Sequence, residues 1–240
     1  MKKEIRVSAK QLGELALRYH CRRCFWVKAK MKGKLPYQSF PGIFSSIDSY
    51  TKKAVLGWFK RHKEAPPWLK ELGELKECID PPGFRKFFVD DEKIGIRLTG
   101  SPDIFFVRED GKLLIVDYKT SKYTGGQQKL MPLYEVQLNA YAYIASRVSK
   151  QFGYPEVGGL ALLYTEPVTE GERIESDGLH RDEHLAMEFK ATPVEIEHRE
   201  DRLLNLLDVA RSILESKEPP KSRHGCHECE RVGKLADLTG

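Results

Sequence analysis

Residues 100–119 decide how the rest of the chain is interpreted, and they read G-S-P-D-I-F-F-V-R-E-D-G-K-L-L-I-V-D-Y-K. Two apolar runs, at 104–107 and 113–116, flank the turn-forming pair Asp110 and Gly111. An Asp-Gly pair between two strand-like runs is a strong short-range signal for a β-hairpin. We therefore predict two antiparallel strands joined at this pair.

Three charged side chains gather at the open end of this hairpin. Asp103 precedes the first apolar run, and Asp117 and Lys119 end the second. Burying a charge costs free energy unless it is paired or holds a metal. Asp117 and Lys119 are two residues apart on a strand, so their side chains share a face. Two carboxylates and the main-chain carbonyl of Tyr118 suit Mg²⁺ or Mn²⁺, which predicts a divalent-metal site with a lysine beside it.

Asp103 reaches that face in only one kind of register. A two-residue turn would set Asp103 opposite Tyr118, on the wrong face of the hairpin. A three- or five-residue loop, or a β-bulge, would set it opposite Lys119, with Asp117 as its diagonal neighbour. The predicted metal site therefore requires such a loop or bulge.

A metal at this place would have chemical consequences. A bound divalent ion lowers the pKa of a coordinated water and neutralises charge on a phosphate. Lys119 could orient or deprotonate that water, or stabilise the charge that develops. An Asp-x-Lys triplet alone is more often a surface ion pair, so its context decides. Gln137 and Tyr141 are four residues apart and share a helix face. They could contact a nucleic-acid strand, or Tyr141 could simply belong to the core.

The bulk composition is that of a soluble globular protein. The chain has 240 residues, 40% hydrophobic and 31% charged, with a net charge of +5. No apolar run approaches the roughly 20 residues of a membrane span. The first residues lack the apolar segment of a secretory signal. We expect a cytoplasmic, intracellular protein without a membrane partner.

Two basic segments, 28–34 and 52–63, carry or adjoin aromatic side chains such as Phe25 and Phe59. A charged track beside aromatic rings suits a nucleic-acid strand. The alternative is a pair of solvated helix faces over ordinary core aromatics.

The cysteines form a second pattern. Cys21 and Cys24 make one C-x-x-C pair, Cys226 and Cys229 make another, and Cys78 has no evident partner. In an intracellular protein, such pairs indicate a metal or cluster more than disulfides. Tetrahedral Zn²⁺ is one candidate, because structural zinc sites favour four cysteines. Four unliganded thiols are the alternative.

The order of predicted elements gives the fold class. We expect a helix capped by Ser8 with Gln11 as its capping-box partner. Further helices are predicted at about 44–63, 133–151 and 201–216, and strands at about 84–89, 93–98, 157–164, 185–189 and 194–196, followed by a short C-terminal tail. This order predicts an α/β (α+β) fold with a central mixed β-sheet flanked by helices.

Three motifs together resemble the PD-(D/E)XK nuclease superfamily, in its RecB-like branch. They are G-S-P-D, I-V-D-Y-K-T and Y-E-V-Q-L-N-A-Y, which place the family's functional positions on Asp103, Asp117, Lys119, Gln137 and Tyr141. The N-terminal V-S-A-K-Q-L and C-R-R-C-F-W also resemble the start of RecB-like nucleases.

The resemblance implies a restriction-endonuclease-like core and Mg²⁺- or Mn²⁺-dependent hydrolysis of phosphodiester bonds, usually in DNA. It implies an exonuclease-like enzyme that acts on single strands or duplex ends, with a possible protein partner in a defence or repair complex. The chain is also similar to the CRISPR-associated adaptation exonucleases and AddB-type nuclease domains. That likeness implies a [4Fe-4S] cluster on Cys21, Cys24, Cys226 and Cys229. Residues 1–240 would then be one domain, whose segments 8–31 and 219–240 are joined by the cysteine site.

The chain departs from these families in two respects. The cluster families use one N-terminal and three C-terminal cysteines, whereas this chain has two and two. Relatives often carry G-x-x-x-H, but here Ser46 follows Gly42 where His is expected. Asp48 could supply a carboxylate ligand, or it could be a surface residue near a helix start. The missing His leaves open a catalytically weak or inactive module that binds DNA or protein.

Overall fold

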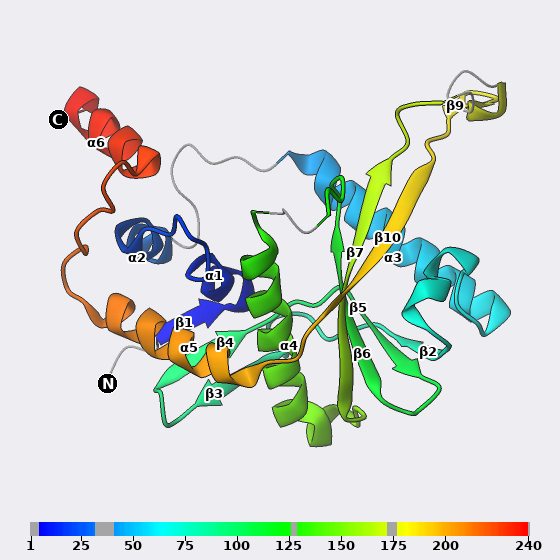
Figure 1. The fold of residues 1–240 in the computed structure, drawn as a ribbon, viewed down its shortest axis with the longest axis horizontal. Coiled ribbons are helices and arrows are strands. Elements are labelled where there is room, and N and C mark those ends of the chain that lie inside the picture. The colour runs from blue at the N-terminus through cyan, green and yellow to red at the C-terminus, as the bar shows by residue number, and fades with distance from the viewer. Residues whose placement is uncertain (1–4, 32–40, 126–128, 172–176, 240) are drawn as a thin grey trace.

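The computed structural model describes residues 5–31, 41–125, 129–171 and 177–239 (Figure 1). Its elements follow in the order β1 (Ile5–Ser8), α1 (Ala9–Glu14), α2 (Arg22–Lys30), α3 (Gly42–His62), η1 (Pro67–Leu72), β2 (Leu75–Ile79), β3 (Phe88–Asp91), β4 (Ile96–Thr99), β5 (Ile104–Arg108), β6 (Leu113–Lys119), α4 (Met131–Phe152), β7 (Val157–Pro167), η3 (Asp177–Leu179), β8 (His180–Arg181), β9 (His184–Leu185), β10 (Phe189–Ile196), α5 (Glu200–Glu215) and α6 (His227–Thr239).

Two mixed sheets, with helices packed around them, organise the molecule. The larger sheet has the order β10-β7-β6-β5-β2, in which β6 and β7 are parallel and the other neighbours antiparallel. The smaller sheet has the order β1-β4-β3, with β1 parallel to β4. The predicted α/β class with a mixed sheet between helices is confirmed, and it is consistent with a restriction-endonuclease-like fold.

One part of the strand prediction is wrong. The strand expected at 84–89 begins only at Phe88, as β3, whereas the strand expected at 93–98 is present as β4, which lies between β1 and β3 in the small sheet. Residues 84–87 lie in a turn, in which the N–H groups of Lys86 and Phe87 donate to the carbonyl of Gly83. The apolar pattern showed strand-like residues but could not show which strand would pair with them.

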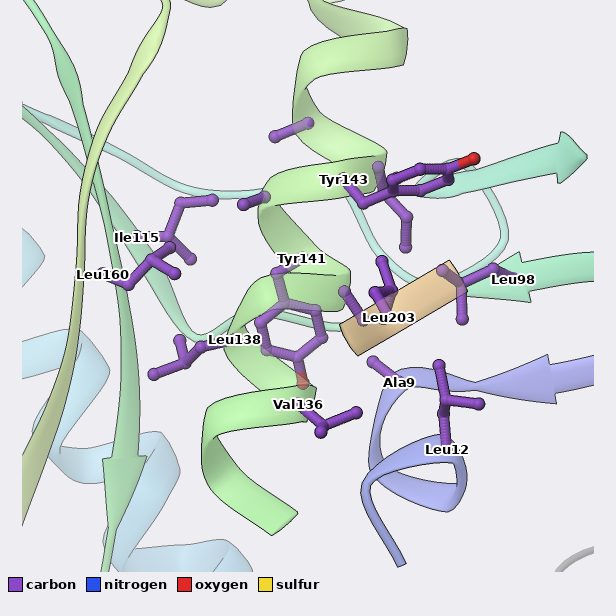
Figure 2. Close-up of a cluster of buried hydrophobic side chains, with 14 of the residues drawn as sticks. Ala9, Leu12, Leu98, Ile115, Val136, Leu138, Tyr141, Tyr143, Leu160 and Leu203 are labelled. Carbon is purple, nitrogen blue, oxygen red and sulfur yellow. The ribbon is translucent and has the colours of Figure 1, made fainter. Parts of the chain in front are cut away.

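Strand β6 separates two hydrophobic cores. Leu113 and Ile115 belong to the core on the side of α4, whereas Leu114 and Val116 belong to the core on the side of α3 and η1. Figure 2 shows the first core, where side chains from α1, β4, β6, β7 and α5 converge on α4. Residues two apart on β6 therefore point toward α4, which determines where Asp117 and Lys119 project.

Helix α1 packs against the start of α4 at very close range. Ser8 and Gln11 form the predicted capping box at the N-terminus of α1. A Cβ atom on Gly13 would lie 2.4 Å from the carbonyl oxygen of Leu133, so only glycine fits. This contact fixes β1 and α1 beside the N-terminal half of α4.

The C-terminal segment is a helix and not the short tail that we expected. Cys226 directly precedes α6, and Cys229 lies in its first turn, where Glu228 and Glu230 suit the positive end of the helix dipole. In Figure 1, α6 and α2 lie on the same side of the molecule, although they are far apart in sequence. Among the described residues, no helix is long and apolar enough to cross a bilayer.

The two basic segments follow in part the alternative that we gave for them, because Trp26 and Trp58 are only partly buried. Phe25 and Phe59 are buried in the cores, so they offer no stacking surface. Lys28 and Lys52 each form an ion pair with an acidic neighbour. Residues 32–34 lie outside the described part of the chain.

Candidate active site and four-cysteine site

The hairpin loop has the odd length that the metal site requires. The N–H of Arg108 donates to the carbonyl of Lys112 at 2.9 Å, and this bond closes a three-residue loop. The last loop residue, Gly111, has φ +76°, the left-handed conformation that such loops place at this position. The prediction of an odd loop is therefore confirmed.

The register brings the two aspartates onto one face. Ile104 pairs with Val116, so Asp103 and Asp117 are the next residues outward and lie opposite each other. We had expected Lys119 opposite Asp103, which is wrong by one pair, but the face is the same. The carboxylate of Asp103 accepts a hydrogen bond of 2.6 Å from the N–H of Tyr118.

Gly100 lets two rings approach the strand that leads to Asp103. A Cβ atom on Gly100 would lie 2.8 Å from Cδ1 of Tyr141 and 2.9 Å from Cδ1 of Phe87. The N–H of Gly100 donates to the carbonyl of Phe87 at 3.0 Å. A glycine is needed in the G-S-P-D motif here because Tyr141 packs directly on the backbone.

Lys119 lies between two polar partners and an aromatic ring. Its ammonium pairs with the Oδ2 atom of Asp117 and donates to Oε1 of Gln137 at 3.3 Å. It also lies 4.3 Å from the centroid of the Tyr134 ring, a cation–π contact. The side chains of Lys119 and Asp117 are 14% and 5% exposed. The lysine is thus held in place and still has access to the pocket.

Gln137 and Tyr141 are buried and connect the two sides of the site. Nε2 of Gln137 donates to Oδ1 of Asp117 at 3.2 Å and to the hydroxyl of Tyr141 at 2.7 Å. The Tyr141 hydroxyl donates in turn to the carbonyl of Ser101 at 3.2 Å. Burial and the charge of Asp117 raise the pKa of Tyr141 well above its usual value, so it stays a neutral donor. These contacts orient Asp117 and Lys119.

A pocket of about 970 Å³ opens over these groups. Its lining includes every predicted active-site residue, Asp48, Asp103, Asp117, Tyr118, Lys119, Gln137 and Tyr141. Asp48 reaches it from α3 and accepts a hydrogen bond of 2.8 Å from the Thr120 hydroxyl. Ser46, at the place of the expected His, is exposed and bonds back to the carbonyl of Gly42. The structure therefore brings Asp48, but not Ser46, to the pocket.

The electrostatics of the pocket suit a bound cation. Burial, together with the charges of Asp117 and Asp48, raises the pKa of Asp103 to about 7, against the opposing effects of the Tyr118 N–H and Lys119. Three carboxylates thus repel one another in a poorly solvated place. A divalent ion with oxygen ligands would relieve this repulsion, so the donor set fits Mg²⁺ or Mn²⁺.

The main-chain carbonyl of Tyr118 fits the same donor set. In a β-strand, the N–H and C=O of one residue point toward the same neighbouring strand. The Tyr118 N–H points at Asp103, so its carbonyl faces that side too.

Among the residues that line the pocket, sequence reasoning missed charged, aromatic and hydroxyl side chains that include Arg6, Lys10, Phe84, Thr120 and Tyr134. Tyr134 could have been found, because it lies three residues before Gln137 on the same helix face. Thr120 follows Lys119 directly. The other three come from β1, α1 and a turn, which no local pattern connects with the hairpin.

The four-cysteine site lies at the junction of α2 and α6. Sγ of Cys24 lies 3.5 Å from those of Cys226 and Cys229, and Sγ of Cys21 lies 3.6 Å from that of Cys229. All four sulfurs are within 4.8 Å of one another. They are free thiols in the structure. The prediction that these cysteines come together is confirmed, and four thiolates form a donor set that fits a soft metal.

The local environment favours a thiolate at Cys21. Burial alone would raise its pKa, but the N–H groups of Arg223 and Cys24 and the neighbouring thiols lower it to about 6. The Arg223 N–H lies 3.3 Å from this sulfur. A thiolate is the form of cysteine that binds metals.

The chain is similar to a known protein family and to a solved structure. The model of the PD-(D/E)XK nuclease superfamily matches residues 26–232. A solved structure entitled "Crystal structure of SSO0001" is similar to the chain with a TM-score of 0.41 and 12% identity, covering 92% of this chain and 81% of that one. No curated protein matches the chain. Because the family model spans most of the sequence, this protein belongs to the PD-(D/E)XK nuclease superfamily.

Proposed function

We propose that this protein is a Mg²⁺- or Mn²⁺-dependent deoxyribonuclease of the RecB-like branch that hydrolyses phosphodiester bonds in an exonuclease-like manner. Membership of the superfamily supports a metal-dependent nuclease, whose substrate is nucleic acid. The choice of DNA, the metal and the mode of cleavage go beyond membership. They are supported by the oxygen donors in the pocket and by the motifs on β5, β6 and α4.

Each residue of the pocket has a distinct role in this proposal. Asp103, Asp117 and the Tyr118 carbonyl would hold the ion, with Asp48 as a further carboxylate. When bound, the ion supplies an activated water and neutralises phosphate charge. Lys119 would orient the attacking water by hydrogen bonding and stabilise negative charge on the phosphate. Gln137 and Tyr141 act through Asp117 and Lys119, as positioning residues.

One observation carries the proposal. The Lys119 ammonium, held by Gln137 over the Tyr134 ring, lies beside the carboxylate of Asp117 in a pocket that also receives Asp103. An ordinary surface ion pair is exposed and contributes little. This pair is almost fully buried and has a polar network behind it, which is typical of a catalytic site.

The test is cleavage of labelled single- and double-stranded DNA in Mg²⁺ or Mn²⁺ by the wild type, Lys119→Ala and Asp117→Ala. We expect both variants to lose at least about 100-fold in rate. Lys112→Ala is a matched control, because Lys112 is exposed at the other end of the same hairpin. Thermal melting checks that each variant folds. Cleavage that survives both substitutions would refute the assignment.

A binding module without cleavage is the second candidate. The position of Ser46 favours it, because its hydroxyl bonds to the helix backbone and supplies no ligand to the pocket. Salt-dependent DNA binding by the wild type without cleavage in either metal would support this candidate and exclude the first.

We also propose that the four cysteines bind one tetrahedral Zn²⁺. With Zn–S bonds of about 2.3 Å, the sulfurs of a tetrahedral site lie about 3.8 Å apart. Three of the six observed separations are 3.5–3.6 Å, close to this value, and all six lie within 4.8 Å. In a [4Fe-4S] cluster, each cysteine binds a different iron, so the cysteine sulfurs lie farther apart. The spacing thus supports zinc over the cluster that the family resemblance implied.

The metal can be identified without an activity assay. Anaerobically purified protein should contain one zinc per chain by elemental analysis and have no absorbance band near about 400 nm. Iron with a brown absorbance in this region would establish the cluster instead. Cys24→Ser should lose the zinc, whereas Cys78→Ser should retain it.

A further inference from the structure

Phe84 lies half exposed at the rim of the carboxylate pocket. Its side chain is 49% exposed, and it lines the same pocket as Asp103, Asp117 and Lys119. A single exposed apolar side chain is common and needs no explanation by itself. An exposed ring beside a candidate nuclease site is different, because nucleic-acid bases stack on aromatic side chains.

A tight turn presents the Phe84 ring. The carbonyl of Gly83 accepts hydrogen bonds from the N–H groups of Lys86 at 2.8 Å and Phe87 at 3.1 Å. The side chain of Phe87 is fully buried. The turn is therefore closed by hydrogen bonds and anchored in the core directly after Phe84.

The same turn is connected to the strand that carries Asp103. The ring of Phe87 packs edge-on at 6.4 Å from the ring of Tyr141, and its carbonyl accepts the 3.0 Å hydrogen bond from Gly100. Gly100 begins the motif that leads to Asp103. Phe84 is consequently fixed relative to the carboxylates through Phe87.

Positive charge surrounds the ring. The guanidinium groups of Arg6 and Arg85 lie 5.6 Å and 5.8 Å from its centroid. Arg6 and Lys10 also line the pocket. The rim on this side is thus cationic and aromatic, whereas the interior carries Asp103 and its neighbours. A nucleic-acid strand needs this combination, with cations for its phosphates and a ring for a base.

We infer that Phe84 stacks on an unpaired base of a single-stranded segment whose phosphates contact Arg6 and Arg85. This inference rests on the proposed nuclease function and specifies the form of its substrate. Inside a duplex, neighbouring base pairs cover both faces of each base, whereas a single strand offers a free face. Asp117 is almost fully buried in the pocket, so one strand can approach it more readily than a duplex can.

The test is binding of a fluorescently labelled 12-nucleotide single strand, measured by anisotropy in Ca²⁺ to avoid cleavage. We expect Phe84→Ala to weaken binding about tenfold and Phe84→Trp to preserve it. Trp68→Ala is a matched control, since Trp68 is 41% exposed but does not line the pocket. Arg6→Ala should reduce the slope of log affinity against log salt by about 0.7.

Two further ligands make the inference refutable. A strand with abasic residues throughout should bind the wild type about tenfold more weakly and should not respond to Phe84→Ala. Phe84→Ala should also leave the affinity for a blunt hairpin duplex unchanged. Equal affinity of Phe84→Ala and wild type for the normal strand would overturn the inference. The inference would also be overturned if Phe84→Ala weakened binding of the abasic strand or of the duplex as much as it weakens binding of the normal strand. If Phe84→Ala fails to fold, the abasic strand with wild-type protein still decides.

This experiment separates the inference from the proposed function. Binding is measured in Ca²⁺, and cleavage is measured on the same proteins in Mg²⁺ or Mn²⁺. Phe84-dependent binding of single strands without any cleavage would support stacking and refute the nuclease activity. If Phe84→Ala changed neither cleavage nor binding, the nuclease activity would be supported and the stacking inference refuted.

Discussion

The two candidate metal sites of this protein are built in opposite ways. Asp103 and Asp117 come from adjacent strands of one hairpin and are oxygen donors beneath an open pocket. Cys24 and Cys226 come from segments 202 residues apart and are sulfur donors between two helices. The first site offers room for a substrate above its ligands, and the second joins distant parts of the chain. The difference teaches that the first should control reaction rate and the second stability.

The largest expected effect separates rate from stability at the carboxylate pocket. Asp117→Asn should lower the cleavage rate about 1,000-fold, because it removes a charged oxygen ligand while preserving the shape of the side chain. The melting temperature should change little, because the lost ion pair with Lys119 is offset by weaker repulsion among the carboxylates. Single-turnover cleavage and thermal melting measure the two quantities. A much lower melting temperature for this variant would contradict the idea that the carboxylate site controls rate and not stability.

The cysteine site should show the opposite behaviour. Replacing Cys24 and Cys226 by serine should lower the melting temperature by about 10 °C, because metal binding contributes to folding free energy. The cleavage rate of the remaining folded protein should fall less than tenfold. Cys78→Ser is the control, since Cys78 lies on β2, outside the site. Complete loss of cleavage at unchanged melting temperature would show that the two sites are coupled.

Gly100→Ala should lower both the stability of the protein and its cleavage rate. The new methyl group would overlap the rings of Tyr141 and Phe87, which lie 2.8–2.9 Å from its position. We expect a loss of about 1–3 kcal/mol in the free energy of unfolding and slower cleavage, because the Tyr141 hydroxyl shifts. Denaturant unfolding checks the first effect. Gly42→Ala should cause neither, since its Cβ would meet nothing within 4 Å.

The smallest effect concerns pH. Asp103 has a pKa of about 7 in the folded protein, against 3.8 as the ordinary value. Between these values, the folded state keeps a proton that the unfolded state has released. Without added Mg²⁺, stability should therefore fall as pH rises through this window. Melting curves from about pH 5 to pH 8 should be flatter for Asp103→Asn. The same slope in both proteins would contradict the pKa shift.

The hairpin site was largely predictable because its geometry follows from local rules. The metal-site hypothesis and the two-residue strand period required an odd loop or a bulge, and Glu109, Asp110 and Gly111 form such a loop. We expected Lys119 opposite Asp103, but Asp117 lies there. An odd loop length fixes only the face that Asp103 occupies, whereas its partner depends on which residues form the closing hydrogen bond.

The rest depends on contacts between distant segments. Phe84 looked like part of a strand, since its neighbours are aromatic and basic, but residues 84–87 form a turn closed by hydrogen bonds to the Gly83 carbonyl, and β3 begins at Phe88. The cysteine pairs were visible as spacing alone. Their separations, which bear on the choice between zinc and a cluster, depend on how α2 and α6 meet.

The four-cysteine site also imposes an order in time on the synthesis of the chain. Cys226 follows Cys24 by 202 residues, which at roughly 5–20 residues per second takes about 10–40 s. The hairpin and α4 leave the ribosome within this interval, and small domains commonly fold within seconds. A chain released before Cys226 would therefore contain the sheets and the pocket but only half of the sulfur ligands. Only chains whose C-terminal helix has been synthesised and packed beside α2 could bind a metal with all four cysteines.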